Sequence, residues 1–302
     1  MSDAVMLRRP WFVSRLLGAP GAVFGTVVIV LVLGLAVLAP YLAPYDWNAT
    51  SQCRRLGPIT ADHWFGCDLF GRDVFSRVIY GARFSLAMGL TTVAISLVFG
   101  ALLGIVIAYA GGRVDRVGAR VIDAMLCFPP IILAILIVAV LGVGLMNAAL
   151  AVGISGIPRF ARITRAATLT RVARDFVEAA RAVGAGHARI VLRHLLPNLA
   201  PILIVIATLD LGGAVLFTAT LSFLGLGAQP PTPEWGAMLN AGREYVRYAP
   251  WTMIFPGLAL FLTVMAVNLV GDRLSLILDP RQRDRSYFHN MYPIIKCVNG
   301  NR

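Results

Sequence analysis

The sequence predicts an all-α, polytopic membrane protein with about six transmembrane helices. Of its 302 residues, 58% are hydrophobic and only 14% are charged, whereas soluble domains carry about 25% charged residues. Long uncharged runs recur along the chain, and a helix that spans a bilayer needs about 20 mostly apolar residues. We expect spans near residues 21–43, 84–110, 119–141, 144–163, 197–226 and 249–271.

The basic residues are distributed unevenly between the two sides of these spans. With the N-terminus placed inside, 20 of the 27 lysines and arginines fall on the cytoplasmic side. This is the positive-inside asymmetry, which reports the orientation of a membrane protein rather than a ligand. It predicts cytoplasmic N- and C-termini, membrane lipid as the surroundings, and no nucleic-acid partner despite the net charge of +12. The outer arginines are Arg54, Arg55, Arg72, Arg77, Arg83, Arg243 and Arg247.

The predicted spans divide the chain into four segments. Residues 1–20 form a cytoplasmic N-terminal segment, followed by an uncharged run longer than the roughly 7–15 residues of a signal-peptide core. Residues 21–83 hold the first span and an extracytoplasmic loop. Residues 84–278 form the membrane core with a polar loop at 164–196, and residues 279–302 form a cytoplasmic tail.

Helical periodicity and glycine spacing predict how some of these helices lie. Apolar residues recur at helical spacing from Phe75 to Leu86 with polar residues between them. This pattern predicts an amphipathic helix at the membrane interface that turns into the second span. The pairs Gly21/Gly25 and Gly100/Gly104 have the GxxxG spacing that lets two membrane helices approach closely.

Two cysteines lie in the outer loop. Cys53 and Cys67 are 14 positions apart, on the side of the membrane where thiols oxidise readily. They are candidates for a disulfide, with two unpaired thiols as the alternative. His63 lies between them, but its spacing matches no zinc-finger pattern, so we predict no metal site.

Asp210 lies about halfway along the predicted fifth span. A charge at that depth is costly in lipid and faces the protein interior or an aqueous cavity. Lining of a pore or cavity and a buried, hydrogen-bonded structural role are equally compatible with this position.

The sequence offers no residues for ATP binding or catalysis. A Walker A loop needs a lysine that reaches the phosphates, and the only lysine is Lys296, followed by Cys297. The chain also contains neither a Gly-x-Ser-x-Gly nor a His-Glu-x-x-His motif. We therefore predict no catalytic residue and no cofactor in this chain.

The loop at 164–196 has a regular pattern for a segment outside the membrane. Eight arginines lie between Arg159 and Arg193. One helix is expected from Thr168 to Val183, with Val172, Phe176, Ala179, Ala180 and Val183 on its apolar face. Gly184 breaks this helix because glycine permits positive φ. A second helix is expected from Ala188 to Leu196 and ends at Pro197, where the fifth span begins.

These residues carry a family resemblance. DFVEAARAVGAGHARIVLRHLLPN resembles the EAA coupling loop of ATP-binding-cassette (ABC) importer permeases. HWFGCDLFGRDVFSRVIYGARFSL and LSFLGLGAQPPTPEWGAML are similar to the C-type subunit of the dipeptide, oligopeptide and nickel permeases. The resemblance covers residues 20–285. Cys67 stands where that family usually has threonine, and Glu234 where a small polar residue is frequent.

The resemblance implies a type I ABC importer permease fold in a bacterial plasma membrane. It implies a second, homologous permease subunit, cytoplasmic ATPases that bind ATP and magnesium, and an extracytoplasmic substrate-binding protein as partners. Glu178, Ala179, Ala180 and Gly184 would dock in the ATPase. The transported substrate would be a dipeptide or oligopeptide, with nickel or another small solute as the alternative. A secondary transporter is the alternative of another class, but the internal repeat expected of one is not visible.

Overall fold

The computed structural model describes residues 18–278, and residues 1–17 and 279–302 lie outside the described part. The predictions for the tail 279–302 and for most of the segment 1–20 therefore concern residues that are not described. Within residues 18–278 the secondary structure is helical, apart from one isolated bridge between Cys67 and Asp73. The predicted all-α fold is confirmed for this part of the chain.

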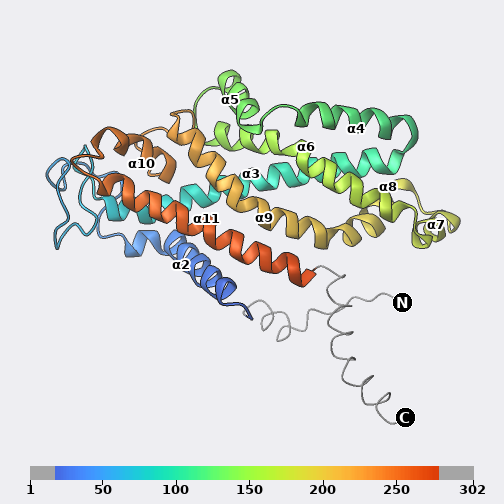
Figure 1. Ribbon diagram of the computed structural model, residues 1–302, viewed down its shortest axis with the longest axis horizontal. Helices are drawn as coiled ribbons and strands as arrows, with labels where there is room; N and C mark the ends of the chain where they lie inside the picture. The colour runs from blue at the N-terminus through green and yellow to red at the C-terminus, as the bar shows by residue number, and fades with distance from the viewer. Residues whose placement is uncertain (1–17, 279–302) are drawn as a thin grey trace, which may run out of the picture.

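Long helices run side by side along the molecule (Figure 1). They are α2 (Pro20–Leu42), α3 (Val74–Ala110), α6 (Leu145–Val172), α9 (Leu196–Phe223) and α11 (Trp251–Leu278). Shorter helices are α4 (Gly112–Leu126), α5 (Pro130–Leu141), α7 (Asp175–Ala182), α8 (His187–Arg189) and α10 (Trp235–Gly242). A π-helical turn at Ile190–Leu195 joins α8 to α9, and a 3-10 turn at Arg243–Tyr245 follows α10.

In residues 18–278, four helices are long and apolar enough to cross a bilayer, namely α2, α3, the continuous helix His187–Phe223 and α11. The α4–α5 pair adds a fifth span if the two helices are taken together, although they are bent by 88°. The predicted third span at 119–141 is therefore not one straight helix. Pro129 and Pro130 explain the break, because proline lacks an N–H and disfavours helical backbone in the residue before it.

The second span is longer than predicted, and no separate interfacial helix precedes it. Helix α3 is continuous over 37 residues, about 55 Å at ~1.5 Å per residue, whereas the hydrocarbon core is about 30 Å thick. Its first turns therefore extend beyond the apolar layer without the predicted bend. Asp73 begins the helix, since its side chain accepts a hydrogen bond from the Ser76 backbone N–H.

Glycines allow the closest helix contacts, as their spacing predicts. A Cβ on Gly100 would lie 2.5 Å from the Cβ of Phe160 in α6, and a Cβ on Gly25 would lie 2.8 Å from the carbonyl oxygen of Ala266 in α11. Helix α3 makes its most extensive contact with α6. The predicted close packing is confirmed at Gly25, Gly100 and Gly104, whereas a Cβ on Gly21 would make an ordinary contact with Leu269, at 3.5 Å.

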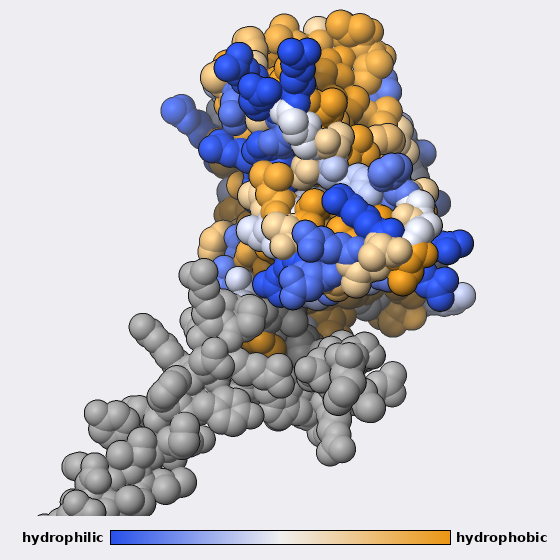
Figure 2. All heavy atoms as spheres, turned by 90° about the vertical axis from the view of Figure 1, so that its right-hand side faces the viewer, coloured by the Kyte–Doolittle hydropathy of each residue, from blue (hydrophilic) through white to orange (hydrophobic). Residues whose placement is uncertain are grey.

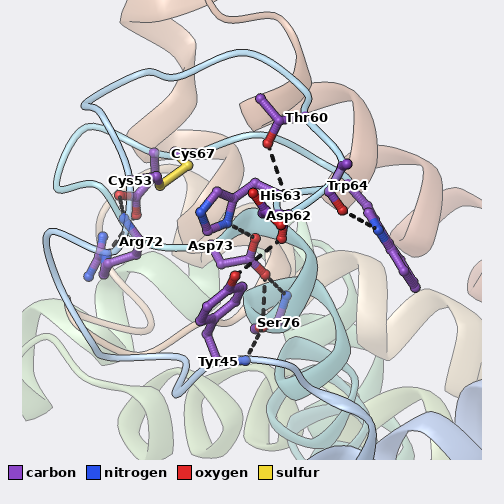
Figure 3. A network of polar contacts seen from close by, with 12 residues as sticks. Tyr45, Cys53, Thr60, Asp62, His63, Trp64, Cys67, Arg72, Asp73 and Ser76 are labelled. Carbon is purple, nitrogen blue, oxygen red and sulfur yellow. Dashed lines mark hydrogen bonds and ion pairs between the residues drawn. A yellow bond between two sulfur atoms is a disulfide. The ribbon is translucent and has the colours of Figure 1, made fainter.

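The outer loop between α2 and α3 is organised by buried polar groups (Figure 3). The His63 Nδ1 atom lies 2.9 Å from the Asp73 carboxylate, and the Tyr45 backbone N–H donates to Ser76 Oγ. Cys53 and Cys67 are joined as a disulfide, with Cα atoms 6.4 Å apart. The sulfurs and the His63 ring could together hold a metal ion only as thiolates, and the disulfide removes those ligands.

Reduction of the Cys53–Cys67 pair is expected to weaken the outer loop. The bond closes a loop with a sequence separation of 14, for which chain entropy gives about 3 kcal/mol of stabilisation. Non-reducing peptide mass spectrometry should recover the crosslinked pair, and Cys53→Ser should lower the thermal midpoint of the purified protein. Cys127→Ser is the matched control, because Cys127 is exposed and unpaired. Alkylation of both thiols without reductant would contradict the prediction.

Candidate functional site

The segment predicted as the coupling loop, residues 164–196, ends in a compact knob (residues 174–196) at one end of the helical bundle (Figure 1). Its first helix, α7, is separated from α6 at Ala173 and Arg174, so the single helix predicted from Thr168 to Val183 is wrong. Acidic groups are favoured in the first turn of a helix. Asp175 and Glu178 occupy the first turn of α7 and favour a new helix start there.

The sequence predicts that the second helix of the knob ends at Pro197, but in the structure it continues past this residue. It runs through a π-helical turn at Ile190–Leu195 directly into α9, and Pro197 lies in the first turn of α9. A π-helical turn shifts the hydrogen-bond pattern by one residue. This shift accommodates a proline, which cannot donate a backbone hydrogen bond. The knob is therefore joined rigidly to the span that follows it.

The knob has its own small hydrophobic core. Val177, Ala180, Ile190 and Leu195 are buried together, with Tyr109 of α3 packed against them. Ala180 is only 7% exposed, so a direct contact of this residue with a partner does not fit the structure. The predicted apolar face is also wrong in part: Ala179 and Val183 point outward and Val177 replaces them.

Gly184 closes α7 with a hydrogen-bond pattern that requires its conformation. Its φ is +78°, in the left-handed region where a residue with a side chain is strained. The Gly184 N–H donates to the Arg181 carbonyl and the Ala185 N–H donates to the Ala180 carbonyl. This pair of bonds is a Schellman cap. It turns the chain sharply and leaves open space around Gly184.

The outward surface of the knob combines positive charge with apolar side chains. Glu178 and Ala179 are exposed there, and Val183 and Leu192 are 83% and 60% exposed. Figure 2 shows this end of the molecule, where hydrophilic surface surrounds hydrophobic patches. Exposed apolar patches with a polar rim mark sites of protein–protein contact. The exposed arginines of the knob are Arg174, Arg181, Arg189 and Arg193.

Asp210 lies in the wall of a cavity of about 110 Å³ between the helices. It forms an ion pair with Arg159 of α6, so the structure brings together a charge of each sign between the two helices. Ser155, Thr92 and Ser96 are other polar residues of the wall. Asp210 therefore combines features of both predicted roles: it lines a cavity, and it is paired with Arg159 within the protein.

Two further ion pairs connect α6 with α4. Arg165 contacts both carboxylate oxygens of Asp115 at 2.7 Å, and Arg162 lies 4.0 Å from Asp123. With Arg159 they form a row of arginines three residues apart on α6. Their acidic partners on α4 and α9 could not be assigned from sequence spacing.

Glu234 has a structural role that its sequence context does not predict. Its carboxylate is fully buried and caps α10 by accepting hydrogen bonds from the backbone N–H groups of Gly236 and Ala237. Ser85 of α3 also donates to it, at 3.2 Å. The next residue, Trp235, donates from its ring to the Val78 carbonyl at 3.0 Å. Together they fasten α10 to α3.

The stability of this end of the molecule is expected to fall as pH rises. Burial raises the pKa of the Glu234 carboxyl above its ordinary 4.5, although hydrogen bonds from Gly236, Ala237, Ser222 and Ser85 act in the opposite sense. The folded state then binds the proton more tightly than the unfolded state. The contribution of Glu234 to stability is therefore fully present below its ordinary pKa of 4.5 and declines as pH rises through the raised pKa.

The thermal midpoint of the purified protein, measured from acidic to neutral pH, checks this expectation. Glu234→Gln should remove the part of the pH slope that Glu234 contributes, whereas the exposed Glu244→Gln should keep it. Equal slopes in the wild type and Glu234→Gln would show that the carboxyl does not change its protonation on folding.

The fold, the knob and the cavity beside Asp210 together define a class of protein: a multi-pass membrane permease with a separate protein-contact knob. The matching family model, "binding-protein-dependent transport system inner membrane component", covers residues 97–284. A second model, "N-terminal TM domain of oligopeptide transport permease C", matches residues 10–58. The chain belongs to the binding-protein-dependent, ABC-type importer permeases and is of the C type.

Curated relatives match over most of their length. A dipeptide transport system permease protein, DppC, from Alkalihalophilus pseudofirmus is 45% identical over 87% of this chain and 86% of its own. A glutathione transport system permease protein, GsiD, from Pectobacterium atrosepticum is 44% identical over 91% and 92%. Among solved structures, the MetNI methionine ABC transporter in an inward-facing conformation matches with a TM-score of 0.55. That match has 24% identity and covers 68% of this chain and 97% of the other. It confirms the type I importer fold.

Proposed function

We propose that this chain is one of two permease subunits of an ATP-driven importer that carries dipeptides or oligopeptides across a bacterial plasma membrane. The observation that carries this proposal is the identity of about 45% over nearly the whole chain with permeases named for dipeptide and glutathione transport. Both are small peptidic substrates. The substrate reaches the permease from an extracytoplasmic binding protein, and the second subunit is a homologous permease.

The knob is the site where a cytoplasmic ATPase acts on this chain. Glu178, Ala179 and Gly184 lie on its exposed surface, where they are available to a partner. Ala180 supports the knob from inside, together with Val177. Because the knob continues without a break into α9, a push on it moves a membrane span and with it the wall that contains Asp210.

ATP and magnesium belong to the ATPase subunits in this proposal, and this chain holds neither. Both termini lie on the cytoplasmic side, the side of the knob. This orientation follows from the positive-inside rule, because arginine is in excess on the side of the knob.

Uptake by whole cells tests the proposed substrate class. Cells that lack this chain should lose uptake of a labelled dipeptide at low external concentration, and re-expression of the chain should restore it. A transporter for another solute would leave dipeptide uptake unchanged. Labelled nickel taken up in proportion to expression of the chain would instead assign the complex to metal import.

A further inference from the structure

The Arg159–Asp210 pair lies between α6 and α9, in the middle part of the helical bundle. Each residue is about halfway along its 28-residue helix, α6 or α9, and the two helices are in contact. Ionisable groups at mid-membrane face the bundle interior or an aqueous path. The Arg159 side chain is nevertheless 55% exposed, while Asp210 is 14% exposed. In a bundle embedded in lipid, the exposed part of the Arg159 side chain is expected to face water or a second protein chain.

The guanidinium of Arg159 is only partly used within the protein. A guanidinium has five N–H donors in a planar fork that fits a carboxylate edge-on. In residues 18–278, Arg159 contacts Asp210 through one terminal nitrogen, Nη1. Arg165, six residues further along α6, instead uses both Nε and Nη2 on Asp115. The fork of Arg165 is filled, whereas an edge of the Arg159 fork is open to a further carboxylate.

The hydroxyl groups of the neighbouring cavity are prepared to accept hydrogen bonds. Thr92, Ser96 and Ser155 each donate their proton to a backbone carbonyl of α6, at 3.2, 2.7 and 2.8 Å. Their oxygen lone pairs remain available. The cavity therefore offers a half-open guanidinium for an anion and several acceptors for N–H groups. A peptide terminus, which carries a carboxylate and an adjacent amide N–H, has the complementary groups.

We propose that Arg159 is a binding station for the terminal carboxylate of the transported molecule, and that Asp210 is the positioning residue that competes for it. This inference rests on the proposed import function. When a ligand carboxylate arrives, it takes the open edge of the guanidinium, and Asp210 holds the other. Because Asp210 stays bound through Nη1, it shares the positive charge of Arg159 with the ligand carboxylate, which is therefore held less tightly than by an unpaired arginine. The contact retains the ligand against backflow without trapping it.

The test uses the assembled complex in proteoliposomes, with a loaded binding protein outside and ATP supplied to the ATPases. Two quantities are measured together, the dipeptide accumulated and the ATP hydrolysed. Arg159→Gln should lower the number of dipeptides moved per ATP about tenfold or more, the effect of losing a charge-assisted hydrogen bond. ATP hydrolysis stimulated by the binding protein should persist.

Asp210→Asn should behave differently from Arg159→Gln. Without its competitor the guanidinium holds the ligand longer, so transport and ATP hydrolysis should slow together and their ratio should remain. Arg162→Gln is the matched control: it lies three residues away on α6, is 67% exposed and also faces an acid. It should keep the wild-type ratio. Arg159→Lys retains the charge but not the fork, and its ratio should be intermediate.

Several outcomes would overturn the binding station. If Arg159→Gln and Asp210→Asn lower the ratio equally and the exchange Arg159→Asp/Asp210→Arg restores it, the pair is structural only. The pair is also structural only if Arg159→Gln prevents assembly of the complex and the exchange Arg159→Asp/Asp210→Arg restores assembly. An equal loss in Arg162→Gln would show that the effect reflects the positive charge of α6 in general and is not specific to Arg159. If the wild-type complex moves no peptide with ATP, the proposed import function fails instead.

Discussion

Replacing Glu178 by arginine is expected to abolish ATP-driven uptake while the protein remains in the membrane. Glu178 is exposed on α7, on a knob whose rim is rich in arginine. The reversal removes a negative charge and adds another positive one at the surface where we propose that an ATPase docks. Loss of one partner of an interfacial charge pair costs about 2–5 kcal/mol, a factor of roughly 30 to several thousand in affinity.

Co-purification of the ATPase and peptide-stimulated ATP hydrolysis measure this effect. Glu178→Gln is the matched variant of the same shape, and it should lose less because it adds no repulsion. Gly184→Trp should have the same consequence by another route, since it fills the open space at the turn and strains a backbone with a φ of +78°. Gly186→Ala is its control, because Gly186 has a φ of −67° and open surroundings. Near-normal docking and hydrolysis in both Glu178→Arg and Gly184→Trp would remove the coupling role from the knob.

Gly104→Leu is expected to prevent stable folding of the bundle. A Cβ on Gly104 would lie 2.5 Å from the Ala161 carbonyl oxygen and 2.8 Å from the Arg165 backbone nitrogen. These atoms belong to the backbone of α6, so no side-chain rotation relieves the clash and the helices must separate. Overpacking in a core costs about 1–3 kcal/mol, and displacement of a whole helix from its main partner lies at the upper end or beyond.

The yield of membrane-integrated protein and its thermal midpoint in detergent measure this second effect. Gly34→Leu is the matched control, since Gly34 is also within a membrane helix and has no neighbour within 4 Å of the added Cβ. The control should resemble the wild type, and Gly104→Leu should be depleted or aggregate at a lower temperature. Equal stability of the two variants would show that α3 and α6 pack less closely than the structure has them.

Local composition was enough to predict most of the helices, because an uncharged run of about 20 residues has few alternatives in a membrane protein. The bend at Pro129 was also readable in principle, since two adjacent prolines interrupt a helix. The start of α3 was predicted wrongly because its first turns are amphipathic and its later turns are apolar, a change of pattern that suggested two helices with a bend between them. The chain nevertheless continues from one to the other as a single helix.

The functional regions were predictable to different degrees. The Gly184 turn could be placed because glycine at a helix end has a local meaning. The partner of Asp210 could not, since Arg159 is on another helix and only the packed bundle brings the two together. Glu234 was overlooked for the same reason: Ser85, which donates to it, is 149 residues away in sequence.

Peptide transport by the purified complex tests the central claim most directly. This chain, a homologous permease and the ATPases would be reconstituted in vesicles, with the binding protein and a labelled dipeptide on the side opposite the knob. The proposed function predicts accumulation of the dipeptide on the side of the knob that requires ATP hydrolysis and stops with Glu178→Arg. Dipeptide movement that is independent of ATP, or no movement while ATP is hydrolysed and the complex remains intact, would contradict it.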